Sequence, residues 1–196
     1  MAPPTGTVPH FLQVAPADAA RPAGCTFSIT LKGDSIAPNP PGTKRPPSDA
    51  QLFCFDTQDA AENSIATDAR SYKVHVPAST ETLRCSGKQL LTDCKAVLVI
   101  TGKLLCDPPS LKTILDPPES IQQMGEIFGS VEGMVVKNFL DGMSKNVQGL
   151  GGGAYFFNSL EQIDKYLGSE LWTQLHGGTE WQDVCYEKYE VVALQC

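Results

Sequence analysis

The stretch Gly149-Leu-Gly-Gly-Gly-Ala-Tyr-Phe-Phe-Asn-Ser-Leu-Glu-Gln-Ile-Asp-Lys-Tyr-Leu167 combines the signals for a turn, a strand and a helix. Its glycines have no Cβ and therefore allow a tight bend before the strand. Three aromatic residues then favour a short β-strand. Ser159, with Gln162 three residues later, has the pattern of a capping box and predicts a helix start. An apolar stripe extends this helix to the glycine pair 177–178, which can end it.

Outward from this stretch, the second half of the chain alternates between strands and helices. Residues 95–102 are a continuous apolar run, as expected for a central strand. Residues 116–129 predict a helix, because Asp and Pro are favoured where a helix starts. Residues 132–139 and 183–194 predict two further strands. The order is that of a split βαβ, ferredoxin-like unit, an antiparallel sheet with helices on one face.

The first half of the chain is rich in predicted β-structure, and we attach no chemistry to its motifs. Its first residues are mainly Ala and Pro without periodicity, which predicts a poorly ordered tail. The predicted fold class is α+β, a ferredoxin-like α/β-barrel unit with a β-rich N-terminal extension. We expect a flexible tail at 1–22, a β-rich region at 23–93 and the ferredoxin-like domain at 94–196.

The composition excludes several classes of partner. A net charge of −7 and a pI near 4.9 argue against nucleic acid or an anionic membrane as the main partner. No apolar run approaches the roughly 18–20 residues that span a bilayer. Residues 1–10 lack the pattern of a secretory signal, and the seven cysteines contain no CxxC pair. We therefore expect reduced thiols, no metal site and a cytoplasmic protein.

The central stretch also carries a family resemblance. Gly-Gly-Ala-Tyr-Phe-Phe-Asn-Ser, followed by a helix with Tyr166-Leu167, resembles the YdhR-type mono-oxygenase family of the dimeric α/β-barrel superfamily. Residues 133–139 are similar to that family's second strand, and the resemblance spans residues 95–192. It implies a homodimer whose two sheets form a barrel. It also implies oxygenation, without a cofactor, of an aromatic or polyketide-like substrate. The alternative to a dimer is that the first half of this chain covers the sheet.

The substrate pocket is expected between the sheet and its helices, where apolar walls and a few polar groups converge. We assign His176 as the catalytic base and Asn138 and Tyr155 as hydrogen-bond donors. The expected substrate-binding residues are Trp172, Trp181, Phe157, Tyr189 and Lys137. Lys137 matches a lysine of the family strand. Where the family often has a histidine on the second helix, this chain has Leu171-Trp172.

Each of these assignments has a simpler structural alternative. A protonated His176 can interact favourably with the negative end of a helix dipole, and His75 can be a structural residue of its strand. The aromatic residues can be ordinary core, and Lys137 can be a solvated side chain. Two other functions stay open. One is a cyclase, isomerase or lyase that uses the same pocket without oxygen, and the other is a non-catalytic ligand-binding module.

Overall fold

The computed structural model describes residues 8–37, 49–63, 69–105, 110–111, 115, 117–145, 147–176 and 181–196. Within these ranges the strands are β1 (Phe11–Pro16), β2 (Phe27–Ala37), β3 (Ala50–Phe55), β4 (Arg70–Val74), β5 (Ala96–Leu104), β6 (Met134–Gly142), β7 (Leu150–Phe157) and β8 (Trp181–Gln195). The helices are α1 (Gln58–Glu62), α2 (Val76–Ser86), α3 (Leu90–Asp93), α5 (Pro118–Gly129), α6 (Leu160–Leu167) and α7 (Glu170–His176).

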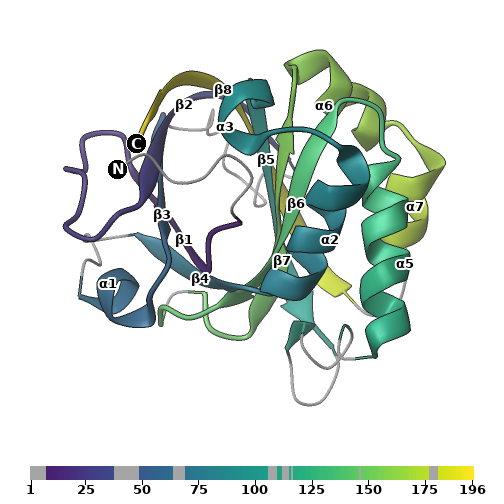
Figure 1. The fold of residues 1–196 in the computed structure, drawn as a ribbon, viewed down its shortest axis with the longest axis horizontal. Helices are drawn as coiled ribbons and strands as arrows, with labels where there is room; N and C mark the ends of the chain where they lie inside the picture. Colours follow the sequence, from purple (N-terminus) through teal and green to yellow (C-terminus); the bar gives the residue numbers. More distant parts are fainter. Residues whose placement is uncertain are drawn as a thin grey trace.

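The strands form one closed barrel in the order β1-β3-β2-β8-β5-β7-β6-β4, and every neighbouring pair is antiparallel (Figure 1). Both halves of the chain use the same neighbour order, β4-β1-β3-β2 in the first and β8-β5-β7-β6 in the second. Two seams join the halves. One is a long pairing of β2 with β8, and the other is a short pairing of β4 with β6.

The predicted fold class, a ferredoxin-like sheet with a separate β-rich extension, is therefore wrong. The expected element order does occur, since β5, α5, β6, β7, α6 and β8 follow one another along the chain. However, both edges of that sheet pair with strands of the first half, which closes the barrel. Periodicity predicts where strands lie along a chain, but it does not show which strand pairs with each sheet edge. An unpaired edge has free N–H and C=O groups that can bond to another strand. Strands from all three predicted segments lie in this one barrel, and β1 comes from the expected tail.

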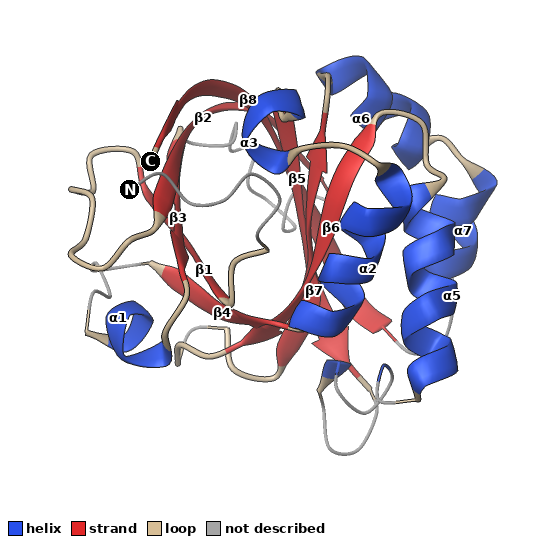
Figure 2. Ribbon diagram, in the orientation of Figure 1, coloured by secondary structure: helices blue, strands red, loops and turns tan. Residues whose placement is uncertain are grey.

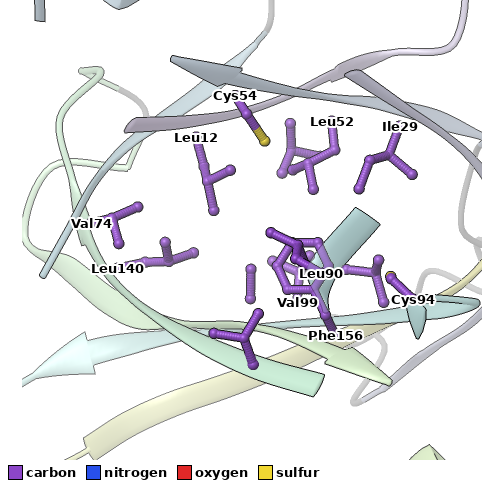
Figure 3. Packing of buried hydrophobic residues seen from close by; sticks show 14 of the residues in the cluster. Leu12, Ile29, Leu52, Cys54, Val74, Leu90, Cys94, Val99, Leu140 and Phe156 are labelled. Carbon is purple, nitrogen blue, oxygen red and sulfur yellow. The ribbon is translucent and has the colours of Figure 1, made fainter. Parts of the chain in front are cut away.

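A hydrophobic core fills the barrel. Leu12, Leu52 and Val74 from the first half face Val99, Leu140 and Phe156 from the second, as Figure 3 shows. These side chains are at most 3% exposed. A second cluster lies on the outer face of the second half, beneath α5, α6 and α7 (Figure 2). The second half therefore has two buried faces, which explains the continuous apolar run in β5.

Helix α2 packs against the part of β6 that does not pair with β4. The Phe139 backbone N–H donates to Ser79 Oγ at 3.2 Å, and Ser86 Oγ donates to the Val135 carbonyl at 2.6 Å. The sequence analysis predicted no helix here, because Pro77 follows a run that alternates like a strand and a proline can end a strand. Pro is equally suited to the first turn of a helix, and Pro77 occupies that position.

Two local predictions around the central stretch need correction. Residues 151–153 belong to strand β7 and do not form the expected bend. The single long helix is divided into α6 and α7 at residues 168–169. The predicted cap is confirmed, since Ser159 Oγ accepts a hydrogen bond from the Gln162 backbone N–H at 3.3 Å. In the described part of the chain, no helix is both long and apolar enough to cross a bilayer.

Candidate active site

A cavity lies between the outer face of β5, β6 and β7 and the helices α5 and α7, with a volume of about 90 Å³. Most of its wall is aliphatic or aromatic. Among the described lining residues, polar side-chain atoms come only from Lys137, Tyr155 and Trp181. The full described lining is Ile100, Leu111, Leu115, Met124, Lys137, Phe139, Gly152, Tyr155, Leu175 and Trp181.

The Lys137 amine is surrounded by aromatic rings. Its Nζ lies 3.6 Å from the ring centroid of Phe128, 4.2 Å from that of Phe139 and 4.8 Å from that of Tyr155. The residue is only 8% exposed, and no carboxylate of the described residues pairs with it. Burial lowers the pKa of Lys137 well below its ordinary value, because the cavity does not hydrate the ammonium form. This burial favours the neutral amine, which is both a base and a nucleophile, while the three ring faces can stabilise the ammonium ion that it becomes.

The strands explain why the lysine reaches this position. Side chains alternate along β6, so Lys137 and Phe139 face the helices while Asn138 faces the barrel interior. Lys137 lies opposite Tyr155 in the register of β6 and β7. Gly153 makes the necessary space. A Cβ at that residue would lie 2.5 Å from Tyr155 Cε2 and 3.2 Å from Lys137 Cε.

Tyr155 is the second polar residue of the cavity. It is 2% exposed, and its ring packs against Phe128 at 5.9 Å and Tyr166 at 5.5 Å between centroids. Burial raises the pKa of Tyr155 well above its ordinary value, since the phenolate would lose its hydration. The hydroxyl therefore stays protonated at neutral pH and can donate a hydrogen bond.

The structure brings three of the predicted site residues together at the cavity, namely Lys137, Tyr155 and Trp181. Phe157 lies in the same outer layer but is fully buried against Tyr166, with 5.8 Å between ring centroids. Trp172 packs edge-on against Tyr166 and Tyr186 and is not among the described lining residues. These two aromatic residues support the wall of the cavity without forming it.

Two predicted residues lie on the other face of the sheet. Tyr189 belongs to the cluster inside the barrel, and Asn138 lies between the interior residues Val136 and Leu140. Neither amide atom of Asn138 has a hydrogen-bond partner among the described residues. A ligand in the cavity cannot contact either side chain directly. Periodicity alone did not show this, because a strand with two buried faces is apolar on both.

His176 is the predicted catalytic base. The residue ends α7, whose neighbouring Leu175 lines the cavity, but its side chain lies outside the described part of the structure. The predicted helix end at 177–178 also lies outside the described residues.

The sequence analysis missed much of the apolar wall and the Phe128 ring beside the amine. One signal was available, because Lys137 is a lone charge within the apolar run Met134–Leu140. A buried lysine must have neighbours that tolerate it, and aromatic faces are such neighbours.

A second hollow, of about 430 Å³, lies at the start of α2 and includes His75, Ser110 and Asp141. Three of its polar groups serve the local structure. His75 Nδ1 accepts from the Ala78 backbone N–H at 3.4 Å, and Ser110 Oγ donates to Asp141 Oδ2 at 3.0 Å. His75 therefore caps a helix. No set of three potential metal-binding side chains is gathered anywhere in the described residues.

No protein-family model matches the sequence, and no curated protein matches it either. Solved structures do share its fold. Two are bacterial proteins, each named a putative monooxygenase. The protein from Fusobacterium nucleatum is 7% identical to this chain, with a TM-score of 0.57. The match covers 96% of this chain and 94% of the Fusobacterium chain. The one from Lactobacillus acidophilus is 11% identical with a TM-score of 0.54 and matches 95% of each chain.

A third solved structure, of an anthrone oxidase-like protein, is 11% identical with a TM-score of 0.57. The match covers 97% of this chain and 94% of that one. The likeness thus extends over nearly the whole chain, beyond the half for which the sequence indicated it. Identities this low establish a common fold, and this chain is structurally similar to proteins named as monooxygenases and as anthrone oxidase-like.

Proposed function

We propose that this protein is a cofactor-independent, monooxygenase-like enzyme that acts on a weakly acidic aromatic substrate in the cavity of Lys137. The observation that carries the proposal is the buried, ring-enclosed amine of Lys137, which lines a mainly apolar cavity. Among the described residues, the base is accordingly Lys137 and not a histidine. The names of three structurally similar proteins support the reaction class.

In this mechanism the neutral Lys137 amine removes a proton from a phenol or from an enolisable carbon of the substrate. The ammonium ion that results lies over Phe128, Phe139 and Tyr155, whose ring faces attract a cation. The substrate anion is electron-rich and transfers electrons to dioxygen. For an activated methylene group, one oxygen atom becomes the product carbonyl and the other leaves as water with the two hydrogens. The electrons therefore balance without an added reductant.

Tyr155 assists by holding the oxygen that becomes negative. Its hydroxyl is protonated at neutral pH and can donate a hydrogen bond to the phenolate or to a peroxide oxygen. Trp181 and Met124 complete the wall around the ring of the substrate. Exclusion of water by this wall strengthens each electrostatic interaction within it.

The size of the cavity restricts the substrate. A cavity of about 150 Å³ accommodates benzene in a protein core, whereas this one measures about 90 Å³. A substrate with one ring therefore requires small side-chain movements, for example of Met124. A polycyclic substrate requires a larger displacement of α7 or Trp181. We accordingly favour single-ring phenols and enols.

The test is oxygen uptake by the purified protein with a panel of single-ring phenols and enolisable ketones, with ¹⁸O₂ to label the product. We expect uptake and label with wild type, and a loss of about 10²–10⁴-fold in kcat for Lys137→Met. Lys165→Met is the matched control, because Lys165 is exposed and pairs with Glu161 at 3.1 Å. Turnover without oxygen uptake would indicate the cyclase, isomerase or lyase alternative. Saturable binding without turnover would indicate a ligand-binding module.

A further inference from the structure

The environment of Lys137 suits a second reaction that is independent of oxygen. Phe128 is not among the described residues that line the cavity, so its ring backs the amine on the side away from the cavity. Phe139 and Tyr155 flank the amine and also line the cavity. Lys137 itself lines the cavity, so a small apolar ligand there would lie against its side chain.

We propose that Lys137 captures aromatic aldehydes in this cavity as a covalent imine. The inference goes beyond the proposed oxygenase function, because it needs neither dioxygen nor turnover. Three features carry it, namely the absence of a carboxylate partner among the described residues, the enclosing rings, and the mainly apolar cavity that Lys137 lines.

The reaction balances with groups that the site contains. The nitrogen lone pair forms a bond to the carbonyl carbon, and the carbonyl π electrons move to oxygen, which takes a proton. The nitrogen loses a proton, the C–O bond breaks, and the hydroxyl leaves as water with a second proton. Tyr155 can lend that proton and regain it, because its hydroxyl is protonated at the cavity wall. The iminium form of the product is a cation, which the three rings stabilise as they would an ammonium.

Two properties of the site favour the imine over its hydrolysis. The wall is mainly aliphatic and aromatic, so little water reaches the C=N bond. The Lys137 amine is also desolvated, which keeps it in the nucleophilic form. Two other lysines have different surroundings. Lys188 pairs with Asp164 at 2.6 Å and with Asp34 at 2.9 Å, and Lys165 is exposed to solvent.

The experiment is reductive trapping of the folded protein with benzaldehyde and cyanoborohydride at neutral pH, followed by peptide mapping. We expect one N-benzyl adduct, on Lys137, formed at least about tenfold faster than on Lys165, because burial lowers the pKa of Lys137 and leaves more of it as free amine beside the cavity. Lys137→Met and Lys137→Arg should lose this adduct, and Lys165→Met should keep it. Near-ultraviolet circular dichroism of each variant shows that the fold is retained.

Labelling that is spread over surface lysines while Lys137 stays unmodified would overturn the proposal. So would a Lys137 adduct that forms only after denaturation, because it would show that aldehydes do not reach the cavity. The outcome is separate from that of the oxygenase test. Aldehyde trapping without oxygen uptake would support this inference and contradict the oxygenase. Oxygen uptake without aldehyde trapping would support the oxygenase and contradict this inference.

Discussion

At the scale of single residues, Lys137 makes stability depend on pH in a defined direction. Its pKa in the folded protein lies below the ordinary value of 10.5, so between these two values the unfolded chain holds a proton that the folded chain lacks. The free energy of unfolding therefore rises with pH through this window. Lys137→Met should flatten that rise and increase stability at neutral pH by at least about 1 kcal/mol, or about 2–4 °C in Tm.

Thermal unfolding of wild type and Lys137→Met across a pH series measures this effect as a difference between two curves. Lys165→Met should leave the wild-type slope unchanged, because that side chain is 53% exposed. Parallel curves for wild type and Lys137→Met would show that Lys137 is charged in the folded protein.

Gly153 is the second residue with a specific consequence. An alanine there places its Cβ against Tyr155 and Lys137, both of which are buried and cannot move freely. We expect Gly153→Ala to cost about 1–3 kcal/mol of stability, as overpacking does, and to weaken ligand binding in the cavity. Gly168→Ala is the control, because its nearest contact would be an ordinary 3.5 Å to the Asp164 carbonyl. Urea denaturation and ligand titration measure the two effects. Equal results for both variants would contradict this role for Gly153.

At the scale of elements, the break between α6 and α7 depends on Ser169. Its Oγ accepts from the Trp172 backbone N–H at 3.1 Å and donates to the Tyr166 carbonyl at 2.6 Å. Loss of such a cap costs about 1 kcal/mol. Since α7 carries Leu175 to the cavity wall, Ser169→Ala should also raise the KM or Kd of a cavity ligand.

Ser130→Ala is the comparison for this element, because Ser130 Oγ donates to the Ile127 carbonyl within the last turn of α5. Its stability should change by less than about 0.5 kcal/mol, with no effect on ligand binding. Stability is measured by urea denaturation and affinity by calorimetry. If Ser169→Ala weakened neither, the position of α7 would not depend on this cap.

At the scale of the whole molecule, an ion pair spans the barrel. Arg70 of β4 and Glu187 of β8 lie on strands at opposite positions of the strand order, and Arg70 Nη1 is 2.6 Å from Glu187 Oε2. Breaking a fully buried pair costs about 3–5 kcal/mol. We expect less here, because the side chains are 26% and 16% exposed. Arg70→Met and Glu187→Leu should each destabilise the barrel, and the double variant should lose less than the sum. Additive losses in urea denaturation would rule out this coupling.

A prediction of the assembly state also belongs to this scale. The homodimer was expected because a second copy would cover the open face of the sheet. Within this chain, the strands of the first half occupy that position. We therefore expect native mass spectrometry to give the 21.1 kDa of one chain. A species of twice that mass would show that the barrel associates through its outer surface.

The sequence by itself determined the local elements of the second half, because periodicity and caps act over a few residues. It identified the Ser159 cap, the continuous strand β5 and the order of strands and helices. It also indicated Lys137, Tyr155 and Trp181 as residues of the space between the sheet and its helices, and all three line the cavity.

Only the tertiary structure decided how sheet edges pair and which face of each strand meets the helices. Strand edges present backbone N–H and C=O groups whatever the sequence. No local pattern therefore shows whether a second copy or the first half of the chain pairs with these edges. A strand buried on both faces shows no alternation, which is why Asn138 and Tyr189 were assigned to the cavity although they face the barrel interior. The three rings around the Lys137 amine likewise come from different elements, Phe128 from a helix and Phe139 and Tyr155 from two strands. Such a contact exists only once the barrel has closed and its helices have packed.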